Sequence, residues 1–300
     1  MIRDLRSENR VNIIDPKSKT KDSGLARVIT AVLLLPFLIA SILISWLQLL
    51  FVLLAAAAMV LGLYEFYLLA KRRDLKPDVA AGYLGAAALF TTFYFNAPGQ
   101  LSDFLIMIQI ILIVLTAGTL ISVTLRGAPF DKMIASTGAT ILGVLYVVLL
   151  GAHLVALRTG FNQRLSAHLL SFFFLVIMGA DAGAYYTGRA LGRHKLAPAI
   201  SPGKTWEGVV GGVLVALAMA ALAHFWFFRE LPLKWALPLA FVMTVVGILG
   251  DLTESALKRS AGAKDAAKLL PGHGGVLDRL DSLLFNAPLI YYFGRLYFNH

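Results

Sequence analysis

Long apolar segments are the feature that most constrains how this chain can fold. A helix that crosses a bilayer needs about 20 mostly apolar residues. The chain has 300 residues, of which 58% are hydrophobic and 15% charged, too few charges to coat a water-exposed globule of this size. The candidate spans are 25–47, 49–70, 79–96, 101–125, 133–157, 167–188, 208–228, 235–250 and 282–299. The eighth span is short and Arg295 interrupts the ninth, so eight spans is the alternative. We predict an all-α polytopic membrane protein with about nine transmembrane helices.

The distribution of Lys and Arg predicts the orientation of these spans. Positive side chains concentrate in cytoplasmic loops. With a cytoplasmic N-terminus, the inner segments are 1–24, 71–78, 126–132, 189–207 and 251–281. Nearly all of the 27 Lys and Arg residues fall in or beside these segments, and the exceptions are Arg158, Arg164, Arg229, Lys234 and Arg295. We therefore expect a cytoplasmic N-terminus. The net charge of +10 then reflects membrane topology, and we expect no nucleic-acid partner.

The ends and the cysteine content limit the remaining classes. Residues 1–24 are polar and basic, and no convincing cleavage site follows them, so the first span is expected to be a retained anchor. Cysteine is absent, which excludes disulfides, zinc–thiolate sites and thiol catalysis. We divide the chain into a cytoplasmic segment at 1–24, an N-terminal transmembrane region at 25–170 and a C-terminal transmembrane catalytic region at 171–300, where the polar side chains gather.

A first polar cluster begins near the inner end of the sixth span. Asp181 lies about one helical turn inside the apolar segment, and Tyr185 and Arg189 follow it at helical spacing. A carboxylate at this depth is costly, so it usually lines a cavity or meets a partner. We predict that these three residues contact substrate. The alternative is a helix-end carboxylate that pairs with Arg189.

The segment before the seventh span resembles a phosphate-binding loop. A Walker motif needs a glycine where this chain has Pro198, so that interpretation fails. Ser201, Lys204 and Thr205 still gather just before a helix start, where anions bind favourably. Glu207 is placed to orient Lys204, and we count all four as substrate-binding candidates. The alternative is a capped helix with basic membrane anchors.

A second polar cluster continues from the eighth span. Asp251, Glu254, Ser255 and Lys258 occupy positions i, i+3, i+4 and i+7, which form one face of a helix. An amphipathic helix of a soluble protein would place apolar residues there. The stripe, with Arg259 beside it, therefore predicts the wall of a site.

The segment 264–281 supplies the remaining candidates. It contains a glycine-rich turn, where backbone can approach a ligand closely. The substrate-binding candidates here are Lys264, Asp265, His273, Gly274, Gly275 and Arg279. We expect His273 to be a phosphate donor or a turn residue rather than a general base. Asp278 and Asp281 open the last span at i, i+3 spacing.

Three acids, Asp251, Asp278 and Asp281, are thus expected at the inner boundary among several basic residues. Oxygen ligands suit Mg²⁺, which is usually held by one or two carboxylates and substrate phosphates. The composition is typical of a phosphoryl or nucleotidyl transfer site. The alternative is a salt-bridge network that joins the helix ends.

The stretch from Ser255 to Asp281 resembles the signature of the phosphatidate cytidylyltransferases, the CDP-diacylglycerol synthases. That signature is S-x-φ-K-R-x₄-K-D followed by φ-P-G-H-G-G-φ-x-D-R-φ-D, and each fixed position is present here. The elements G-D-L-x-E-S at Gly250, S-P-x-K-T-x-E-G at Ser201 and D-x-x-A-Y-x-x-G-R at Asp181 resemble the same family. Residues 1–170 match only as a generic multi-span region. The match is weakest at Gly203, because many members of the family carry another residue there.

The resemblance implies transfer of a cytidylyl group from CTP to phosphatidate, which gives CDP-diacylglycerol and pyrophosphate. It implies Mg²⁺, with K⁺ as a second ion that the three acids could support. The implied catalytic residues are Asp251, Lys258, Arg259, Asp278 and Asp281, with the three acids as metal ligands. It also implies a bacterial-type inner membrane location with the active site facing the cytoplasm, and it is compatible with a homodimer.

Three alternatives come from other classes. The CDP-alcohol phosphatidyltransferases need a D-G-x₂-A-R motif, which Asp181 and its neighbours do not match. A CTP-dependent kinase acting on a polyprenol lipid would release CDP rather than pyrophosphate. An anion transporter would also place charge in the membrane, but we find no related halves with interrupted helices.

Overall fold

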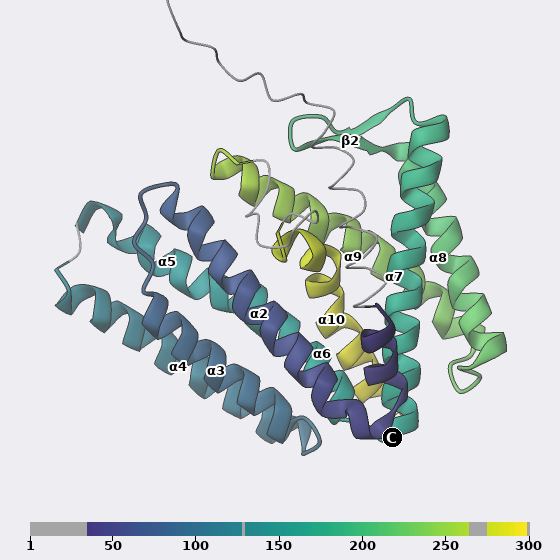
Figure 1. Ribbon diagram of the computed structural model, residues 1–300, viewed down its shortest axis with the longest axis horizontal. Helices are drawn as coiled ribbons and strands as arrows, with labels where there is room; N and C mark the ends of the chain where they lie inside the picture. The colour runs from purple at the N-terminus through teal and green to yellow at the C-terminus, as the bar shows by residue number, and fades with distance from the viewer. Residues whose placement is uncertain (1–34, 128–129, 264–274, 299–300) are drawn as a thin grey trace, which may run out of the picture.

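The computed structural model describes residues 35–127, 130–263 and 275–298. Residues 35–43 are helical. The elements that follow are η1 (Ser45–Leu47), α2 (Gln48–Lys71), α3 (Val79–Asn96), α4 (Leu101–Leu125), η2 (Phe130–Lys132), α5 (Met133–Gly143), η3 (Val144–Leu149), α6 (Leu150–Thr159), α7 (Gln163–Leu191), β1 (Lys195–Ala197), β2 (Ser201–Thr205), α8 (Trp206–Trp226), α9 (Leu233–Ser260) and α10 (Leu277–Phe298). The long helices run side by side, with the β1–β2 hairpin at one end (Figure 1).

The helices coincide closely with the spans expected from sequence. α3 and α4 have the same bounds as the stretches 79–96 and 101–125, and the fifth stretch is a continuous helix over 130–159. Six helices are long and apolar enough to cross a membrane, namely Ser45–Lys71, Leu101–Leu125, Phe130–Thr159, Gln163–Leu191, Trp206–Trp226 and Leu233–Ser260. The helical content and these six helices confirm the prediction of an all-α membrane protein. The antiparallel β1–β2 hairpin is an addition that the hydropathy pattern did not predict.

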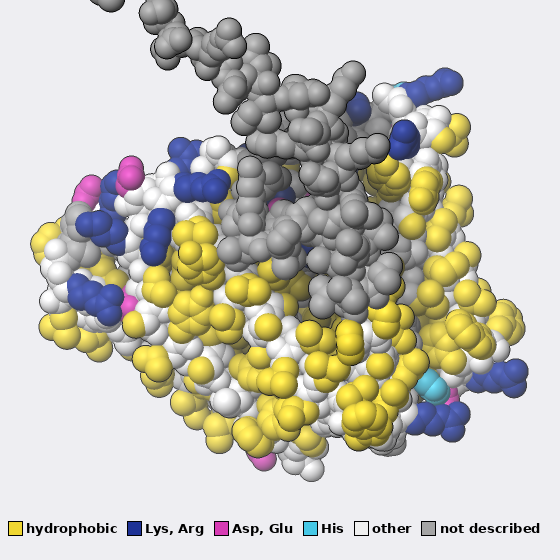
Figure 2. All heavy atoms as spheres, in the orientation of Figure 1, with side chains coloured by type: hydrophobic (Ala, Val, Ile, Leu, Met, Phe, Trp, Pro, Cys, Tyr) yellow, Lys and Arg dark blue, Asp and Glu magenta, His cyan; other side chains and the backbone are white. Residues whose placement is uncertain are grey.

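The outward surface of the bundle is largely apolar. Leu84, Ile134 and Leu125 are among the most exposed large hydrophobic side chains. Hydrophobic side chains cover much of the lower and right-hand parts of the face in view, whereas Lys and Arg gather toward its margins (Figure 2). Such an extended apolar surface is far larger than soluble monomers tolerate, so it is expected to face lipid.

The helix over 130–159 is the innermost element of the N-terminal region. It contains a π-helical stretch, η3, which is a rare geometry found frequently at functional sites. Gly143 lets α2 approach closely, because an added Cβ would lie 2.7 Å from Tyr67 Cε1 and 2.9 Å from Phe66 Cδ1. This contact holds α2 against the core of the protein.

Small residues also bring α7 and α8 together. A Cβ at Gly183 would lie 2.8 Å from the backbone oxygen of Gly211, and one at Gly212 would lie 3.0 Å from that of Ala180. Interfaces of this kind let membrane helices gain van der Waals contact where lipid provides no hydrophobic driving force. The α7–α8 pair forms one wall of the site described below.

We expect Gly183→Ala to destabilise the protein by about 1–3 kcal/mol, because the new methyl group overlaps backbone that cannot move aside cheaply. The matched control is Gly118→Ala on α4, where an added Cβ meets nothing within 4 Å. Alanine is the better helix former, so the control should be neutral or stabilising. Thermal midpoints in detergent test this, and equal midpoints for the two variants would contradict the packing argument.

Asp78 stabilises the turn between α2 and α3. Its side chain, only 1% exposed, accepts hydrogen bonds from the Ala81 N–H (3.1 Å) and Ser122 Oγ (2.5 Å), and pairs with Arg126 at 3.1 Å. Burial alone would raise the pKa of Asp78, but these donors outweigh it and hold the pKa below its ordinary value.

The lowered pKa of Asp78 predicts a pH-dependent contribution to stability. The contribution is complete above the ordinary aspartate pKa of about 3.9 and is lost as pH falls through the lowered value. Asp78→Asn should therefore be less stable than wild type at neutral pH, and the difference should shrink on acidification. Thermal midpoints between about pH 7 and about pH 3 measure this. Asp74→Asn, at an exposed acid, is the control, and a difference independent of pH would refute the assignment.

Candidate active site

A cavity of about 770 Å³ lies between α7, the hairpin, α8, α9 and the start of α10. It collects side chains from four separate sequence motifs. The candidate residues that line it are Asp181, Tyr185, Arg189, Ser201, Lys204, Thr205, Asp251, Asp278, Arg279 and Asp281. The cavity lies at the end of the bundle that carries the hairpin (Figure 1). The structure thus brings together residues up to a hundred positions apart in the sequence.

The α7 wall presents an acid, a tyrosine and an arginine at successive turns. Arg189 Nη1 donates to Tyr185 Oη at 3.1 Å. Among the residues that the structure describes, no ion pair joins Asp181 to Arg189, so the alternative of a helix-end pair is not seen. Asp181 lines the cavity instead.

The hairpin places Ser201, Lys204 and Thr205 beside the N-terminus of α8. Thr205 is the N-cap of α8, and its Oγ1 accepts the Gly208 N–H at 3.2 Å. The capped helix that sequence reasoning considered as an alternative is therefore present. Ser201 and Lys204 of the same strand line the cavity. The segment therefore both caps α8 and forms part of the cavity wall.

Glu207 does not orient Lys204 as expected from their spacing. Its Oε1 contacts His194 Nδ1 at 2.6 Å, and its carboxylate also accepts the backbone N–H groups of Arg193 and His194. The correction has a simple cause: residues 195–205 fold back as a hairpin, so the chain before β1 returns to the start of α8. Glu207 holds the base of the hairpin and does not line the cavity.

Three acids of the cavity lie near a single lysine. Lys204 Nζ lies 2.7 Å from Asp251 Oδ2. Asp181, Asp251 and Asp281 lie close enough to one another for mutual electrostatic repulsion, with Lys204 as the nearby positive charge. Three acids beside one ammonium group repel one another when they are ionised, and a cation would relieve that repulsion. This corner of the cavity therefore favours a cation.

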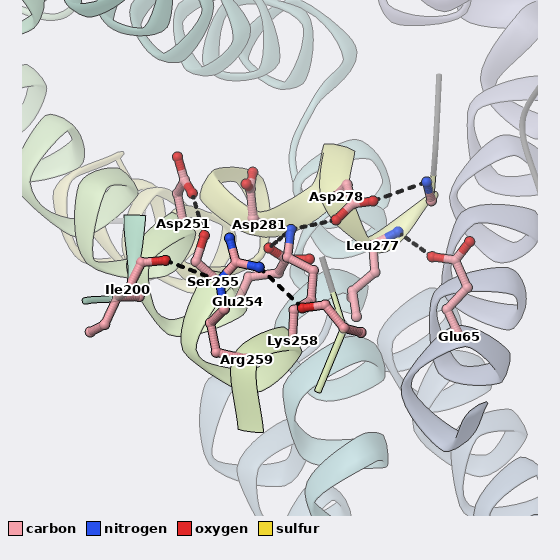
Figure 3. Close-up of polar contacts among 12 residues, drawn as sticks. Glu65, Ile200, Asp251, Glu254, Ser255, Lys258, Arg259, Leu277, Asp278 and Asp281 are labelled. Atoms are coloured by element: carbon pink, nitrogen blue, oxygen red, sulfur yellow. Dashed lines mark hydrogen bonds and ion pairs between the residues drawn. The ribbon is translucent and has the colours of Figure 1, made fainter. Parts of the chain in front are cut away.

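The second group is centred on Lys258. Its Nζ lies 2.6 Å from Glu254 Oε2 and 2.6 Å from Asp278 Oδ1 (Figure 3). Glu254 is fully buried, and neither Glu254 nor Lys258 lines the cavity. The predicted salt-bridge network is thus present here, and it joins α9 to α10. Ser255 belongs to the same stripe, with its Oγ 3.4 Å from Asp251 Oδ1.

Arg259 contacts backbone rather than the cavity. Its Nε donates to the Ile200 carbonyl at 3.4 Å and its Nη1 to the Ala263 carbonyl at 3.3 Å. Arg279 does line the cavity. The remaining candidates Lys264, Asp265, His273 and Gly274 lie outside the described residues. Gly275 is described, and its N–H donates to Asp278 Oδ2 at 3.0 Å.

Two residues of the N-terminal region approach this site without having been predicted. Glu65 of α2 is fully buried and contacts the start of α10. Glu65 is the only acid in the apolar stretch 49–70, and this isolated charge is the sequence feature that could have identified it. Tyr146, on the π-helical stretch, is buried within electrostatic range of Glu254 and Asp281. No sequence pattern marks a π-helix, so Tyr146 could not have been found.

The donor types suit a hard cation, although the side chains do not form a complete cage. Among the described residues, no three His, Asp or Glu side chains are grouped closely enough to hold a metal ion alone. Four aspartates nevertheless line one cavity, and Mg²⁺ usually takes only one or two carboxylates together with substrate phosphates. The residues therefore fit an ion that binds with a phosphate substrate.

Comparison with known proteins identifies the family. The family model described as "Cytidylyltransferase family" matches residues 25–297. The chain belongs to the cytidylyltransferase family. It is 34% identical over 241 residues to the phosphatidate cytidylyltransferase of Bacillus subtilis, a match that covers 77% of this chain and 85% of the relative. The resemblance drawn from the motifs is confirmed.

Shorter matches to relatives of the same name have higher identity. The Haemophilus influenzae phosphatidate cytidylyltransferase is 46% identical over 129 residues, which is 42% of this chain and 45% of the relative. The Brucella suis enzyme is 48% identical over 127 residues, or 42% of this chain and 46% of the relative. These two matches span about half the length of those relatives. The family match also includes most of the N-terminal region, for which the motifs gave no information.

Lys258→Met should be strongly destabilising, by about 3–5 kcal/mol, because it leaves the buried Glu254 carboxylate without its positive partner. The double variant Lys258→Met with Glu254→Gln should recover part of this loss, since a neutral amide is cheaper to bury. Thermal midpoints of the wild type, both single variants and the double variant form the required cycle. Additive effects of the two substitutions would contradict a direct buried ion pair.

Proposed function

We propose that this protein transfers a cytidylyl group from CTP to phosphatidate, releasing pyrophosphate and forming CDP-diacylglycerol for phospholipid biosynthesis. The observation that carries the proposal is the cavity in which side chains from all four family motifs meet. Membership of the cytidylyltransferase family and the name shared by the relatives support the same reaction. The arrangement combines carboxylates for a cation with basic groups for phosphate oxygens.

The position of the cavity suits one substrate from water and one from lipid. The polar wall lies at the end of the bundle with the hairpin, and apolar residues Ile177, Met178 and Leu283 also line the space. Met178 is 51% exposed and precedes Asp181 by about one helical turn, on the membrane side. A phosphatidate could therefore keep its acyl chains in lipid while its phosphate reaches the acids and bases.

The proposed topology has nine spans with the N-terminus in the cytoplasm of a bacterial-type inner membrane. Support comes from the basic segments 71–78, 126–132 and 189–207, which connect helices at the same end as the cavity (Figure 1). With that orientation the active site faces the cytoplasm, where CTP is present. The division at residue 170 into two transmembrane regions and the homodimer also remain proposals. Light scattering of the purified protein tests the homodimer.

We propose that the reaction requires Mg²⁺, with K⁺ as a possible second ion. Asp251, Asp278 and Asp281 would hold it, and Asp181 faces the same cavity. A bound Mg²⁺ would neutralise charge on the triphosphate and on the leaving pyrophosphate.

The other steps depend on the chain's own basic side chains. Arg189, Lys204 and Arg279 line the cavity and are placed to bind the phosphate oxygens of the two substrates. Lys258, held by Glu254 and Asp278, keeps the α9 and α10 walls in register. An ionised phosphatidate oxygen attacks the α-phosphorus of CTP, and the bond to the pyrophosphate oxygen breaks. Because the attacking oxygen is already ionised, the reaction needs positioning and charge stabilisation rather than a protein nucleophile.

Asp251→Asn tests this proposal. Turnover with CTP, phosphatidate and Mg²⁺ in detergent should fall by at least about 100-fold, because the cavity loses a carboxylate and Lys204 loses its partner. Asp103→Asn is the matched control, since Asp103 is an exposed acid in the first turn of α4. Near-normal turnover of well-folded Asp251→Asn would refute the assignment.

Product analysis of the wild-type protein tests the reaction itself. Pyrophosphate together with CDP-diacylglycerol is the expected result. Release of CDP with a polyprenol acceptor would identify a lipid kinase instead. No product with either acceptor would favour the non-enzymatic transporter.

A further inference from the structure

Glu65 links the N-terminal region to the start of α10. Its Oε1 accepts the Val276 N–H at 2.9 Å. Its Oε2 accepts the Leu277 N–H at 2.7 Å, the bond drawn in Figure 3. These bonds join positions 211 and 212 residues apart. Glu65 is fully buried, so water cannot replace it if the contact is lost.

The backbone at this point needs such acceptors. The first N–H groups of an α-helix have no partner within the helix, and a carboxylate satisfies them while interacting favourably with the helix dipole. Asp278 accepts the Gly275 N–H, so Asp278 and Glu65 together occupy three successive N–H groups. The direction in which α10 begins is therefore set partly by α2.

Close packing of α2 against α10 supports this contact. An added Cβ at Gly62, about one turn before Glu65, would lie 3.6 Å from Leu280 Cδ1 and 3.1 Å from Val147 Cγ1. α2 thus approaches both α10 and the π-helical stretch. Since Asp278 and Asp281 line the cavity on the first turns of α10, a shift of this turn would move both carboxylates.

We propose that Glu65 is a positioning residue for the cytidylyl transfer reaction. It holds the backbone at the start of α10 so that Asp278 and Asp281 face the cavity, although Glu65 itself does not line it. The inference rests on the proposed function for its catalytic consequence. The anchoring of α10 can be measured separately.

The test compares Glu65→Gln with Leu63→Ala. Glutamine keeps the size of the side chain but replaces one acceptor oxygen with an NH₂ group, which cannot accept an N–H. Leu63 is also fully buried on α2, and its Cδ1 would lie 3.1 Å from a Cβ added at Gly143 of α5, so its truncation perturbs the same helix without removing an acceptor from the start of α10. Two readouts are needed: kcat and KM from pyrophosphate release per folded molecule, and hydrogen exchange of the peptide containing Val276 and Leu277.

For Glu65→Gln we expect kcat to fall about 10-fold or more, as is usual for residues that orient the groups at a metal or phosphate site. KM for CTP should stay within about twofold, because Arg189 on α7 and Lys204 on β2 lie away from the turn that Glu65 holds. Hydrogen exchange at the backbone amides of Val276 and Leu277 should be faster than in the wild type. Leu63→Ala should lower the thermal midpoint while leaving kcat per folded molecule and this exchange near wild type.

A wild-type kcat for Glu65→Gln would overturn the proposal, as would an equal loss of kcat in Leu63→Ala, which would indicate a purely structural role. If the wild-type protein releases no pyrophosphate, the proposed function fails, and exchange alone decides the anchoring. Faster exchange in Glu65→Gln then supports the anchor, and unchanged exchange overturns it.

Discussion

Burying charge at the boundary of an apolar bundle is costly unless each charge has a partner, and Lys258 meets that requirement for two helices at once. It lies between Glu254 on its own helix and Asp278 on α10. A buried carboxylate without this lysine would carry the full desolvation cost. The contact therefore holds α9 and α10 together, and the cavity between them and α7 depends on that arrangement.

This constraint divides the acids into two groups with different properties. Asp278 and Glu254 both pair directly with Lys258, whereas Asp181, Asp251 and Asp281 have one lysine nearby, Lys204, which contacts Asp251. The first group ties α9 to α10, and in the second group three acids beside one lysine favour binding of a cation. The sequence left a salt-bridge network and a catalytic site as competing interpretations. The structure shows the network at Lys258 and, beside it, a cavity lined by acids and bases.

The N-terminal region contributes more contacts to the surroundings of the cavity than its lack of motifs indicated. Glu65 contacts the start of α10, Tyr146 is buried near the acids, and Arg73 at the end of α2 donates to the Ser260 carbonyl at the end of α9. α2 therefore braces both helices that carry the second polar cluster. This is consistent with a family match that begins at residue 25.

The sequence by itself predicted most of the helices and the polar residues that line the cavity, together with five polar candidates that do not line it, namely Glu207, Glu254, Ser255, Lys258 and Arg259. The bounds of α3 and α4 were predictable because a bilayer imposes a length and an apolar composition on each span. The motifs contain the acids and bases that line the cavity. Sequence could not predict that Glu207 binds His194, that residues 195–205 form a hairpin, or that Glu65 reaches Val276 and Leu277. Those contacts depend on where helices cross and where the chain turns back. Such partners are chosen by burial and hydrogen-bond satisfaction between distant segments, which only the tertiary structure decides.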